Sequence, residues 1–445
     1  MKIQSLKGMK DLLESDLILF KKIERKAQEI LEFYGFQKIE TPILELTELF
    51  ERATGQSSEI VQKQMFSFRN KGGEGLSLRP EYTPSIVRAY FEHGMDVFSK
   101  PVKLWYSGPC FRYEKPQAGR LRQFHQLGFE FLGSESWILD VQTAQLVFKI
   151  LESIGFENLI FKINTIGDSQ CRPYYKKALS EYFRHHRNSF CNDCKNRLKL
   201  NSLRILDCKE EKCQEIKQEA PQILNYLCGD CHKHFEKVLE GLEELEISYT
   251  LDPYLVRGLD YYTRTVLEIF KEDNKEVEKD KEIKKEITPN EEKKLEKEEG
   301  ESQIALGGGG RYDNLAKILG GRETPAIGFS FGIERLVRLL GEERKKEPKS
   351  LTGVKIFFIQ IGELAKKKSL KLLEEFRKEK IKIITSLSKD SLSAQLKLAD
   401  KLKIRYVLIF GQKEAIEGTI IVRDLKTGKQ NIIEFKKIIK EMKKK

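Results

Sequence analysis

The amino-acid sequence predicts an α+β protein that carries a separate α/β domain at its C-terminal end. Residues 102–133 form two strand-like segments, rich in aromatic and branched side chains, on either side of a short polar loop. From Gly353 onwards, strand-like and helix-like segments alternate, which is typical of a small α/β domain with a mixed sheet. With 445 residues, the chain is long enough for two or three domains with substantial cores.

The N-terminal part predicts a helix followed by an interrupted strand. Apolar residues recur at helical spacing in residues 17–31, and Gly35 provides an end for this helix. Residues 36–50 then favour a strand, but Pro42 interrupts it, so this strand should lie at a sheet edge or contain a bulge. An amphipathic helix is expected later, from Ile138 to Ile154.

The return strand of the 102–133 pair alternates strictly between two faces, because successive side chains of a strand point to opposite sides. Arg112 and Glu114 likewise share a face of the outgoing strand. Buried unpaired charges cost several kcal/mol, so if this charged face of the strand pair is buried, it predicts a polar ligand. The alternative is that the polar face is exposed to solvent. The apolar face comprises His125, Leu127, Phe129 and Phe131, and the polar face comprises Phe124, Gln126, Gly128 and Glu130.

Residues 76–90 predict a strand, a turn and the start of a helix. Glu81 and Thr83 are two residues apart in this segment, so both side chains can reach the same pocket. Thr83 and Pro84 also suit the first turn of a helix, and a simple helix cap is therefore the alternative interpretation.

Residues 251–270 predict a second polar site in front of a strand of branched residues. Arg257 stands next to a glycine, which permits close approach of a ligand. The hydroxyls of the adjacent Tyr261 and Tyr262 can donate to or accept from a ligand. An aromatic pair packed in a core would explain the tyrosines but not the arginine.

The glycine-rich segment 305–319 predicts a turn into a helix, and it matches neither the dinucleotide-binding nor the P-loop pattern. Residues 326–340 predict a strand, a turn at Gly332 and a helix with Arg335 in its first turn. A cation at this position adds to the positive N-terminal end of the helix and predicts an anion site. A surface arginine is the alternative.

Six of the eight cysteines lie within 41 residues and include two CxxC pairs. Each pair can donate two thiolates to one tetrahedral zinc ion. However, the 33 residues between the pairs exceed the usual spacing, and Cys208 and Cys213 could replace either pair. Free thiols are the alternative to a metal site. The predicted structural Zn²⁺ ligands are Cys191, Cys194, Cys228 and Cys231.

The net charge of +12 is concentrated in one part of the chain. Residues 353–445 contain 24 Lys and Arg against 11 Asp and Glu, whereas the remainder is nearly neutral. This excess indicates a polyanion-binding module, with a merely lysine-rich domain as the alternative. Residues 271–301 contain nine Lys and thirteen acidic residues, which predicts a disordered or solvated charged insertion. Residues 341–352 contain Pro348 and predict a linker.

The sequence contains no run of eighteen apolar residues and no apolar N-terminal leader. We therefore expect a cytoplasmic protein without a membrane segment. In that compartment, cysteines are thiols or metal ligands rather than disulfides.

The polar segments also resemble a known family. The stretch FRYEKPQAGRLRQFHQLGFE, within residues 102–133, resembles motif 2 of class II aminoacyl-tRNA synthetases, and of the histidyl-tRNA synthetase family in particular. RGLDYYT resembles the histidine-specific motif of that family, residues 326–340 resemble motif 3, and residues 36–50 resemble motif 1. The motif 2, histidine-specific and motif 3 matches occur in the family's order, and the resemblance spans nearly the whole chain.

The resemblance implies a class II antiparallel sheet flanked by helices in a catalytic domain over residues 1–340. A helical insertion domain over residues 165–250 and an anticodon-binding α/β domain over residues 353–445 are also implied. It further implies that L-histidine and ATP, with Mg²⁺, give histidyl-adenylate and pyrophosphate, and that histidine then passes to the 3′ end of tRNA(His). In the family, motif 1 contributes to a homodimer interface.

The same resemblance assigns roles to individual residues. Arg112 and Arg257 are the expected catalytic residues. The expected histidine-binding residues are Glu81, Thr83, Arg112, Gln126, Glu130, Arg257, Tyr261 and Tyr262. The expected ATP-binding residues are Arg112, Glu114, Phe124 and Arg335. The candidates for contacting the tRNA acceptor end are Gln117, Arg120 and Arg122.

Two other function classes are compatible with such a chain. One is a non-catalytic paralogue that acts as a regulatory subunit in histidine biosynthesis, and such paralogues typically lack the C-terminal domain and an intact RGLDYYT stretch. The other is an RNA-binding protein with an inactive synthetase body, which predicts damage at Arg112, Arg257 or Arg335. All three arginines are present.

Overall fold

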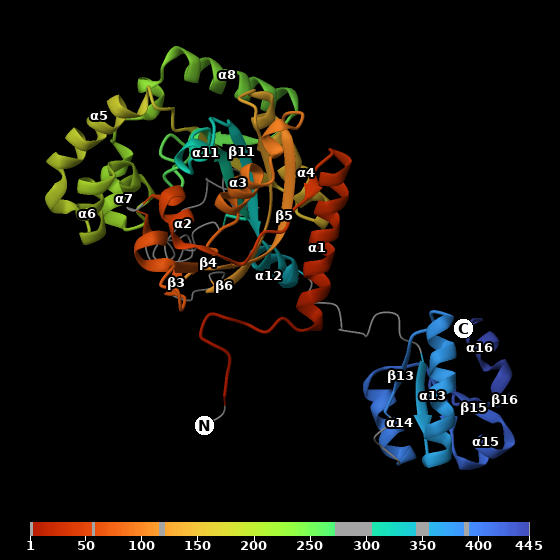
Figure 1. Cartoon of the computed structure of the whole chain (residues 1–445). Helices are drawn as coiled ribbons and strands as arrows, with labels where there is room; N and C mark the ends of the chain where they lie inside the picture. The colour runs from red at the N-terminus through yellow and green to blue at the C-terminus, as the bar shows by residue number, and fades with distance from the viewer. Residues whose placement is uncertain are drawn as a thin grey trace, which may run out of the picture. The chain divides into compact units, whose positions relative to one another are not determined.

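The computed structural model of the chain forms two compact units, Met1–Glu343 and Arg344–Lys445 (Figure 1). It describes residues 3–55, 58–114, 121–271, 305–343, 356–386 and 391–444. Gln117 and Arg120, nearly all of the charged run 271–301 and most of the expected linker 341–352 lie outside the described residues. No helix in the described part of the chain is long and apolar enough to cross a membrane.

The first unit is organised around an eight-stranded sheet with the order β1-β5-β6-β11-β10-β9-β7-β8. Neighbouring strands are antiparallel except at the two edges, where β1 pairs with β5 and β8 pairs with β7 in parallel. The strands are β1 (Gln37–Lys38), β5 (Val102–Phe111), β6 (Gln123–Leu132), β7 (Leu159–Thr165), β8 (Tyr249–Leu251), β9 (Thr263–Lys271), β10 (Gly307–Arg311) and β11 (Ala326–Gly332). The expected antiparallel sheet flanked by helices is confirmed.

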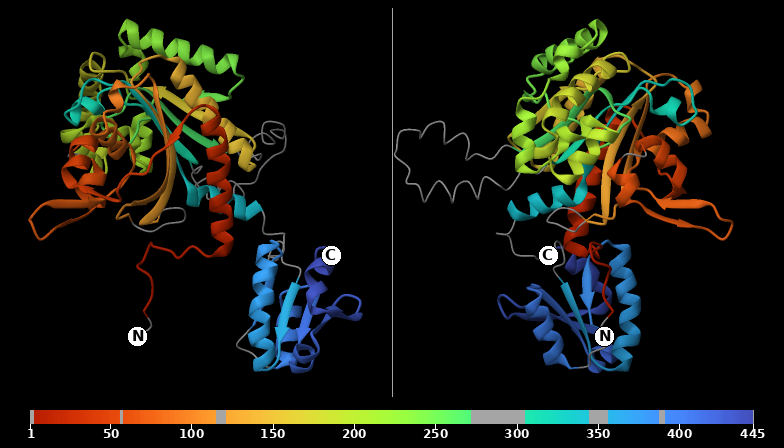
Figure 2. Two further views of the ribbon diagram at one scale, coloured as in Figure 1. Left: turned by 45° about the vertical axis from the view of Figure 1, so that its right-hand side comes forward. Right: turned by 90° about the vertical axis from the view of Figure 1, so that its left-hand side faces the viewer.

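The two faces of this sheet bury two separate cores, as the alternation in β6 predicts. Leu127, Phe129 and Phe131 are fully buried against the helices on one face, where α1 lies along the sheet (Figure 2). Tyr106 and Leu132 point to the opposite face and pack in a core that includes α3. The helices are α1 (Glu14–Phe33), α3 (Thr83–Glu92), α4 (Ile138–Ile154), α8 (Gly229–Glu244) and α12 (Ile333–Glu343).

The segment around Pro42 differs from its prediction as one interrupted strand. It forms two strands, β1 and β2 (Leu44–Leu46), which belong to different sheets, and its last residues begin the helix α2 (Thr47–Thr54). β2 pairs with β4 (Gly75–Leu78), which also pairs with β3 (Phe66–Arg69) in a small antiparallel sheet. Because proline cannot donate to a strand ladder, the chain leaves the large sheet at this point.

The prediction of a turn at the glycine run is wrong, because Gly307–Arg311 form β10, a fully buried inner strand. Glycine is unfavourable in strands in general, but the neighbours of this strand leave no room for side chains. A Cβ at Gly308 would overlap the guanidinium of Arg257, and one at Gly309 would lie 2.7 Å from the Cα of Phe329.

Between β7 and β8 the chain forms a helical insertion whose helices α5 (Arg172–His185), α6 (Asn192–Leu200) and α7 (Glu211–Gln218) lie together at one end of this unit (Figure 1). Its small core is built from aromatic and aliphatic side chains, including Leu179, Phe183, Phe190 and Ile205, together with three buried cysteines. α8 then leads back toward the sheet and packs on α4.

The second unit has a mixed five-stranded sheet with the order β13-β12-β14-β15-β16, in which β12 is parallel to both neighbours and the remaining pairs are antiparallel. The predicted strands and helices are present, whereas α15 (Gln412–Glu417) and β16 (Gln430–Glu434) were not expected from the sequence. The other elements are β12 (Ile356–Gln360), α13 (Glu363–Lys378), β13 (Ile383–Thr385), α14 (Leu392–Lys401), β14 (Tyr406–Phe410), β15 (Thr419–Asp424) and α16 (Ile438–Met442).

Candidate active site

Glu130 lies at the centre of a buried cluster of polar side chains on the α3 side of the sheet. Its carboxylate accepts hydrogen bonds from the hydroxyls of Thr83 at 2.9 Å, Tyr106 at 3.0 Å and Tyr312 at 2.7 Å. Burial raises the pKa of Glu130 to about 7, although the three hydroxyl donors oppose this increase. A carboxylate held in this way can bind a cationic ligand group, because binding a cation favours its charged form.

Glu81 is a second buried carboxylate in the same cluster. Tyr261 donates a 3.0 Å hydrogen bond to its Oε2 atom, whereas its Oε1 atom is buried and has no hydrogen-bond partner among the described residues. Burial raises the pKa of Glu81 to about 7, and the cations Arg112 and Arg257 oppose this increase. Buried polar atoms are normally paired, so Oε1 indicates a position for a donor from a ligand.

Arg257 lies over the glycine strand β10, where only a residue without a side chain leaves room for its guanidinium. It forms an ion pair with Glu268 of β9, and its buried Nε atom has no hydrogen-bond partner among the described residues. Its guanidinium lies 5.8 Å from the ring centre of Tyr262. Desolvation works against its charge, but Glu268 outweighs it and raises the pKa of Arg257, so this guanidinium remains a cation.

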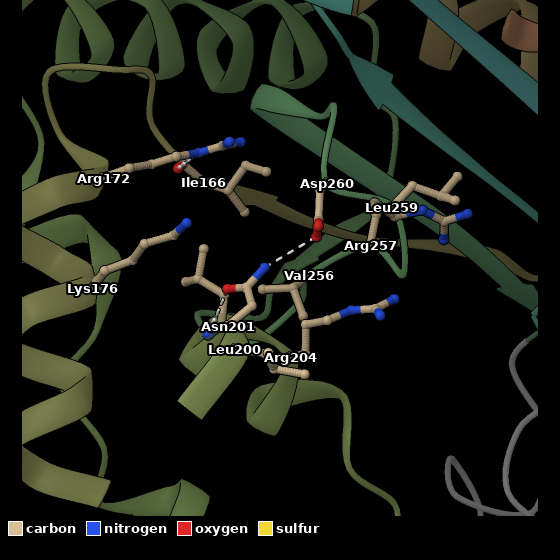
Figure 3. A pocket seen from close by; sticks show the side chains of 11 residues that line it. Ile166, Arg172, Lys176, Leu200, Asn201, Arg204, Val256, Arg257, Leu259 and Asp260 are labelled. Atoms are coloured by element: carbon tan, nitrogen blue, oxygen red, sulfur yellow. Dashed lines mark hydrogen bonds between the residues drawn. The ribbon is translucent and has the colours of Figure 1, made fainter. Parts of the chain in front are cut away.

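The loop that carries Arg257 is held by the helical insertion. Arg204 donates to the carbonyl of Gly258, and the Asn201 side-chain amide donates to Asp260 over 3.0 Å. A cavity of about 190 Å³ lies here, and its lining includes Asn201, Arg204 and Asp260 together with Arg172 and Lys176 of α5 (Figure 3). The cavity is rich in cations and lies directly beside Arg257.

Arg112 and Phe124 meet across the β5–β6 pair. The Arg112 guanidinium lies 5.3 Å from the ring centre of Phe124, and its Nε atom donates to the carbonyl of Pro80 over 2.9 Å. Gln126 accepts a 3.3 Å hydrogen bond from the Cys110 thiol. Glu114 follows the end of β5, and its backbone amide donates to the Arg112 carbonyl over 2.9 Å.

Arg335 and Arg122 lie near the same end of the β5–β6 pair. Arg335 stands in the first turn of α12, which follows directly after Gly332, the residue opposite Gln126 in the sheet. Its side chain donates to the Ala305 carbonyl over 3.0 Å. The Arg122 guanidinium lies 3.9 Å from the ring centre of Tyr113.

The structure does not bring the two CxxC pairs together, so the ligand set expected from the sequence is wrong. Seven of the eight cysteines fall into two separate groups. One group is Cys191, Cys194, Cys208 and Cys213, and the other is Cys171, Cys228 and Cys231 with Asp168. The spacing in the sequence could not reveal this, because the partners of each pair come from other turns and helices.

Two family models match separate parts of this chain. The family model for histidyl-tRNA synthetase matches residues 8–168, and the model for the anticodon binding domain matches residues 355–445. A histidine–tRNA ligase from Thermosipho melanesiensis is 42% identical over 97% of this chain and 96% of its own length. One from Caldicellulosiruptor saccharolyticus is 39% identical over the full length of both chains.

The chain belongs to the histidyl-tRNA synthetase family. The crystal structure of apo histidyl-tRNA synthetase from S. aureus has the same fold, with a TM-score of 0.75, 32% identity and coverage of 99% of both chains.

Several residues of the site in this member of the histidyl-tRNA synthetase family were not predicted from the sequence. Tyr106 and Tyr312 both donate to Glu130, and Glu268 pairs with Arg257. One signal for Tyr106 was available, because it lies opposite Gly128 in the hairpin, and a Cβ at Gly128 would lie 2.5 Å from its hydroxyl. Tyr312 and Glu268 gave no such signal, since their positions depend on long-range strand register.

Two buried arginines support the site without facing it. Arg79 donates to the carbonyls of Thr41 at 2.7 Å and Pro109 at 2.8 Å, and it stacks on Tyr82, which stacks on Tyr106. Arg79 therefore fixes Tyr106, one of the donors to Glu130.

Arg311 lies at the end of β10 and is completely buried. It is ion-paired with the buried Asp140 of α4 and with Asp313 at 3.2 Å, and Asp140 also contacts His234 of α8 at 3.2 Å. Arg311 holds the pKa of Asp140 at about 2, against the burial that would raise it. This network ties β10, α4 and α8 together behind the cluster.

Proposed function

We propose that this chain is a histidine–tRNA ligase, which activates L-histidine with ATP and then transfers the histidyl group to the 3′ end of tRNA(His). The observation that carries this proposal is the pair of buried carboxylates, Glu81 and Glu130, in one cluster with Arg257, which lies over the glycines of β10. Histidine offers an imidazole N–H and an ammonium group, and both need an acceptor at a fixed separation.

Different residues bind different chemical groups of the substrate histidine. Glu130, with Thr83 and Gln126, binds the ammonium and carboxylate ends of histidine. The Oε1 atom of Glu81, which has no partner among the described residues, accepts a hydrogen bond from the imidazole, and Tyr261 and Tyr262 line the pocket around the ring. This arrangement would discriminate against amino acids without an imidazole, because they would leave a buried polar atom unpaired.

ATP is positioned by the cations of the β5–β6 pair and of α12. Phe124 stacks on the adenine, and Glu114, which follows the end of β5, also contributes to the ATP site. Arg112 and Arg257 hold the α-phosphate, and Arg335 holds the γ-phosphate. Mg²⁺ enters with ATP as the metal–nucleotide substrate and neutralises the oxygens of the leaving pyrophosphate.

The first reaction is an in-line displacement, in which the histidine carboxylate attacks the α-phosphorus and pyrophosphate leaves. The protein contributes mainly by positioning the two reactants and by stabilising charge in a desolvated site. Arg257 is suited to this role because its charge is secured by Glu268. The ribose hydroxyl at the tRNA 3′ end then attacks the adenylate.

The proposal extends to partners and domains. Residues 1–340 form the catalytic domain with its insertion at residues 165–250, and residues 353–445 bind the anticodon through their basic excess. Gln117, Arg120 and Arg122 contact the acceptor end of the tRNA. We expect a homodimer in the cytoplasm, with the motif 1 segment at the dimer interface.

Histidine-dependent exchange of pyrophosphate into ATP tests this proposal directly, with the other nineteen amino acids as controls. Exchange with histidine alone supports the activation step and the assignment of the pocket together. Absence of exchange with every amino acid, in protein with a native circular dichroism spectrum, would overturn the enzyme assignment. Aminoacylation of a tRNA(His) transcript then tests the transfer step.

A further inference from the structure

The first cysteine group lies inside the helical insertion and is built from three consecutive elements. Cys191 caps α6, Cys194 lies in its first turn, Cys208 ends the 3-10 turn Ser202–Asp207, and Cys213 lies in α7. All four sulfur atoms lie within 4.8 Å of one another. Cys194, Cys208 and Cys213 are at most 5% exposed.

The sulfur spacing in this group suits a metal tetrahedron, and none of its cysteines is in a disulfide. Zinc–thiolate bonds are about 2.3 Å long, so the sulfur atoms of a tetrahedral site lie roughly 3.8 Å apart. The Cys191 and Cys208 sulfur atoms are 3.9 Å apart. A disulfide would require about 2.05 Å, and all eight cysteines are free.

Backbone donors already point at these sulfur atoms. The amide of Cys194 donates to the sulfur of Cys191 at 3.4 Å, and the amide of Cys191 donates to the sulfur of Cys213 at 3.4 Å. Such donors stabilise thiolates and orient them, as the outer shell of a metal site does.

The second group connects the start of the insertion to its end. Asp168 and Cys171 lie between β7 and α5, whereas Cys228 caps α8 and Cys231 lies in its first turn. Their ligand atoms also lie within 4.8 Å of one another, and the amide of Cys228 donates to the sulfur of Cys171 at 3.1 Å.

Two features around this second group are compatible with a bound divalent cation. Gly167 has a φ of +61°, and a Cβ there would lie 2.7 Å from the Cβ of Cys171, so glycine permits Cys171 to pack against the turn that leads from β7 to Asp168. Arg264 lies 3.8 Å from Asp168 and offsets the negative charge that three thiolates and a carboxylate would leave around a divalent ion.

We propose that the insertion holds two tetrahedral zinc ions. One is bound by Cys191, Cys194, Cys208 and Cys213, and the other by Asp168, Cys171, Cys228 and Cys231. The thiols bind as thiolates and release their protons. The first ion closes the small core of the insertion, and the second ties its two ends together beside β7.

The first ion also has a consequence for the active site. Asn201 and Arg204, which hold the loop of Arg257, lie between Cys194 and Cys208 in the sequence. The ion therefore fixes the turn from which these two side chains reach the loop. It is a structural ion, because all four coordination positions are filled by protein.

The test is the zinc content of the full-length protein, purified without chelator and measured by mass spectrometry. We expect about two zinc ions per chain. The double variant Cys208→Ser/Cys213→Ser and the double variant Cys228→Ser/Cys231→Ser should each retain about one. Cys110→Ser is the matched control, because Cys110 is buried but belongs to neither group, and it should retain two.

A spectroscopic measurement keeps the proposal testable if a double variant fails to fold. Wild-type protein reconstituted with Co²⁺ should show the visible bands of tetrahedral cobalt and thiolate charge-transfer absorption. A mercurial thiol reagent should release the metal in proportion to the thiols titrated. Protein that contains no zinc and takes up none after incubation with Zn²⁺ and gel filtration would overturn the proposal. A double variant that folds and keeps both ions would overturn the group that it changes.

Discussion

Replacing Glu130 by glutamine is a sharp test of the proposed histidine site. Glutamine preserves the shape of the side chain, and its amide oxygen can still accept from Thr83 and Tyr106 at the distances of 2.9 and 3.0 Å seen for the carboxylate. The charge, however, is lost. A hydrogen bond to a charged group contributes about 1.5–3 kcal/mol, so KM for histidine should rise about 10- to 150-fold.

The assay is histidine-dependent pyrophosphate exchange, with KM for ATP measured in parallel. KM for ATP should change little, because Glu130 is assigned to the amino acid alone. Glu135→Gln is the matched control, since Glu135 follows β6 a few residues later and is exposed. An unchanged KM for histidine in correctly folded Glu130→Gln protein would refute the assignment of the ammonium to this carboxylate.

Three further outcomes follow from the structure. Arg257→Ala should lower pyrophosphate exchange by about 10²- to 10³-fold while binding of tRNA, measured by filter retention, changes little; unchanged exchange would remove Arg257 from the chemistry. Arg311→Met should lower the free energy of unfolding in urea by about 3–5 kcal/mol, because it leaves the buried Asp140 without its main partner; a loss below 1 kcal/mol would contradict this. Folding raises the pKa values of Glu81 and Glu130 from 4.5 to about 7, so between these pH values the folded protein binds more protons than the unfolded chain. The free energy of unfolding should therefore fall as the pH rises from about 4.5 to about 7. Replacing both carboxylates by glutamine should flatten this dependence, and an unchanged slope would show that other groups cause it.

Much of the local structure could be predicted from the sequence, because it follows from short-range periodicity. The helix expected from Ile138 to Ile154 has those bounds in the structure. The alternation along β6 placed Phe129 in the core and Glu130 on the polar face, since a period of two leaves no other choice for a half-polar strand.

The rest depended on contacts between distant segments. The glycine run is a strand because Arg257 and Phe329 occupy the space above it, and no local propensity indicates that. Tyr312 reaches Glu130 only through the register of β10 and β11 in the sheet. The cysteine groups are likewise assembled from segments as far apart as Cys171 and Cys228.

The pairing of β7 with β9 and of β9 with β10 explains how the catalytic sheet accommodates long connections. Thr165 lies opposite Thr265, and Ile269 lies opposite Gly307, so in each antiparallel pair a long stretch of chain separates two strands that lie side by side. The entropic cost of closing a loop grows only with the logarithm of its length, by about 0.6 kcal/mol per doubling. A connection of roughly 100 residues therefore costs only about 3 kcal/mol more than a four-residue turn. Added residues at these two points cost the sheet little free energy, which explains how a whole helical domain and a long charged segment can stand between strands that remain paired.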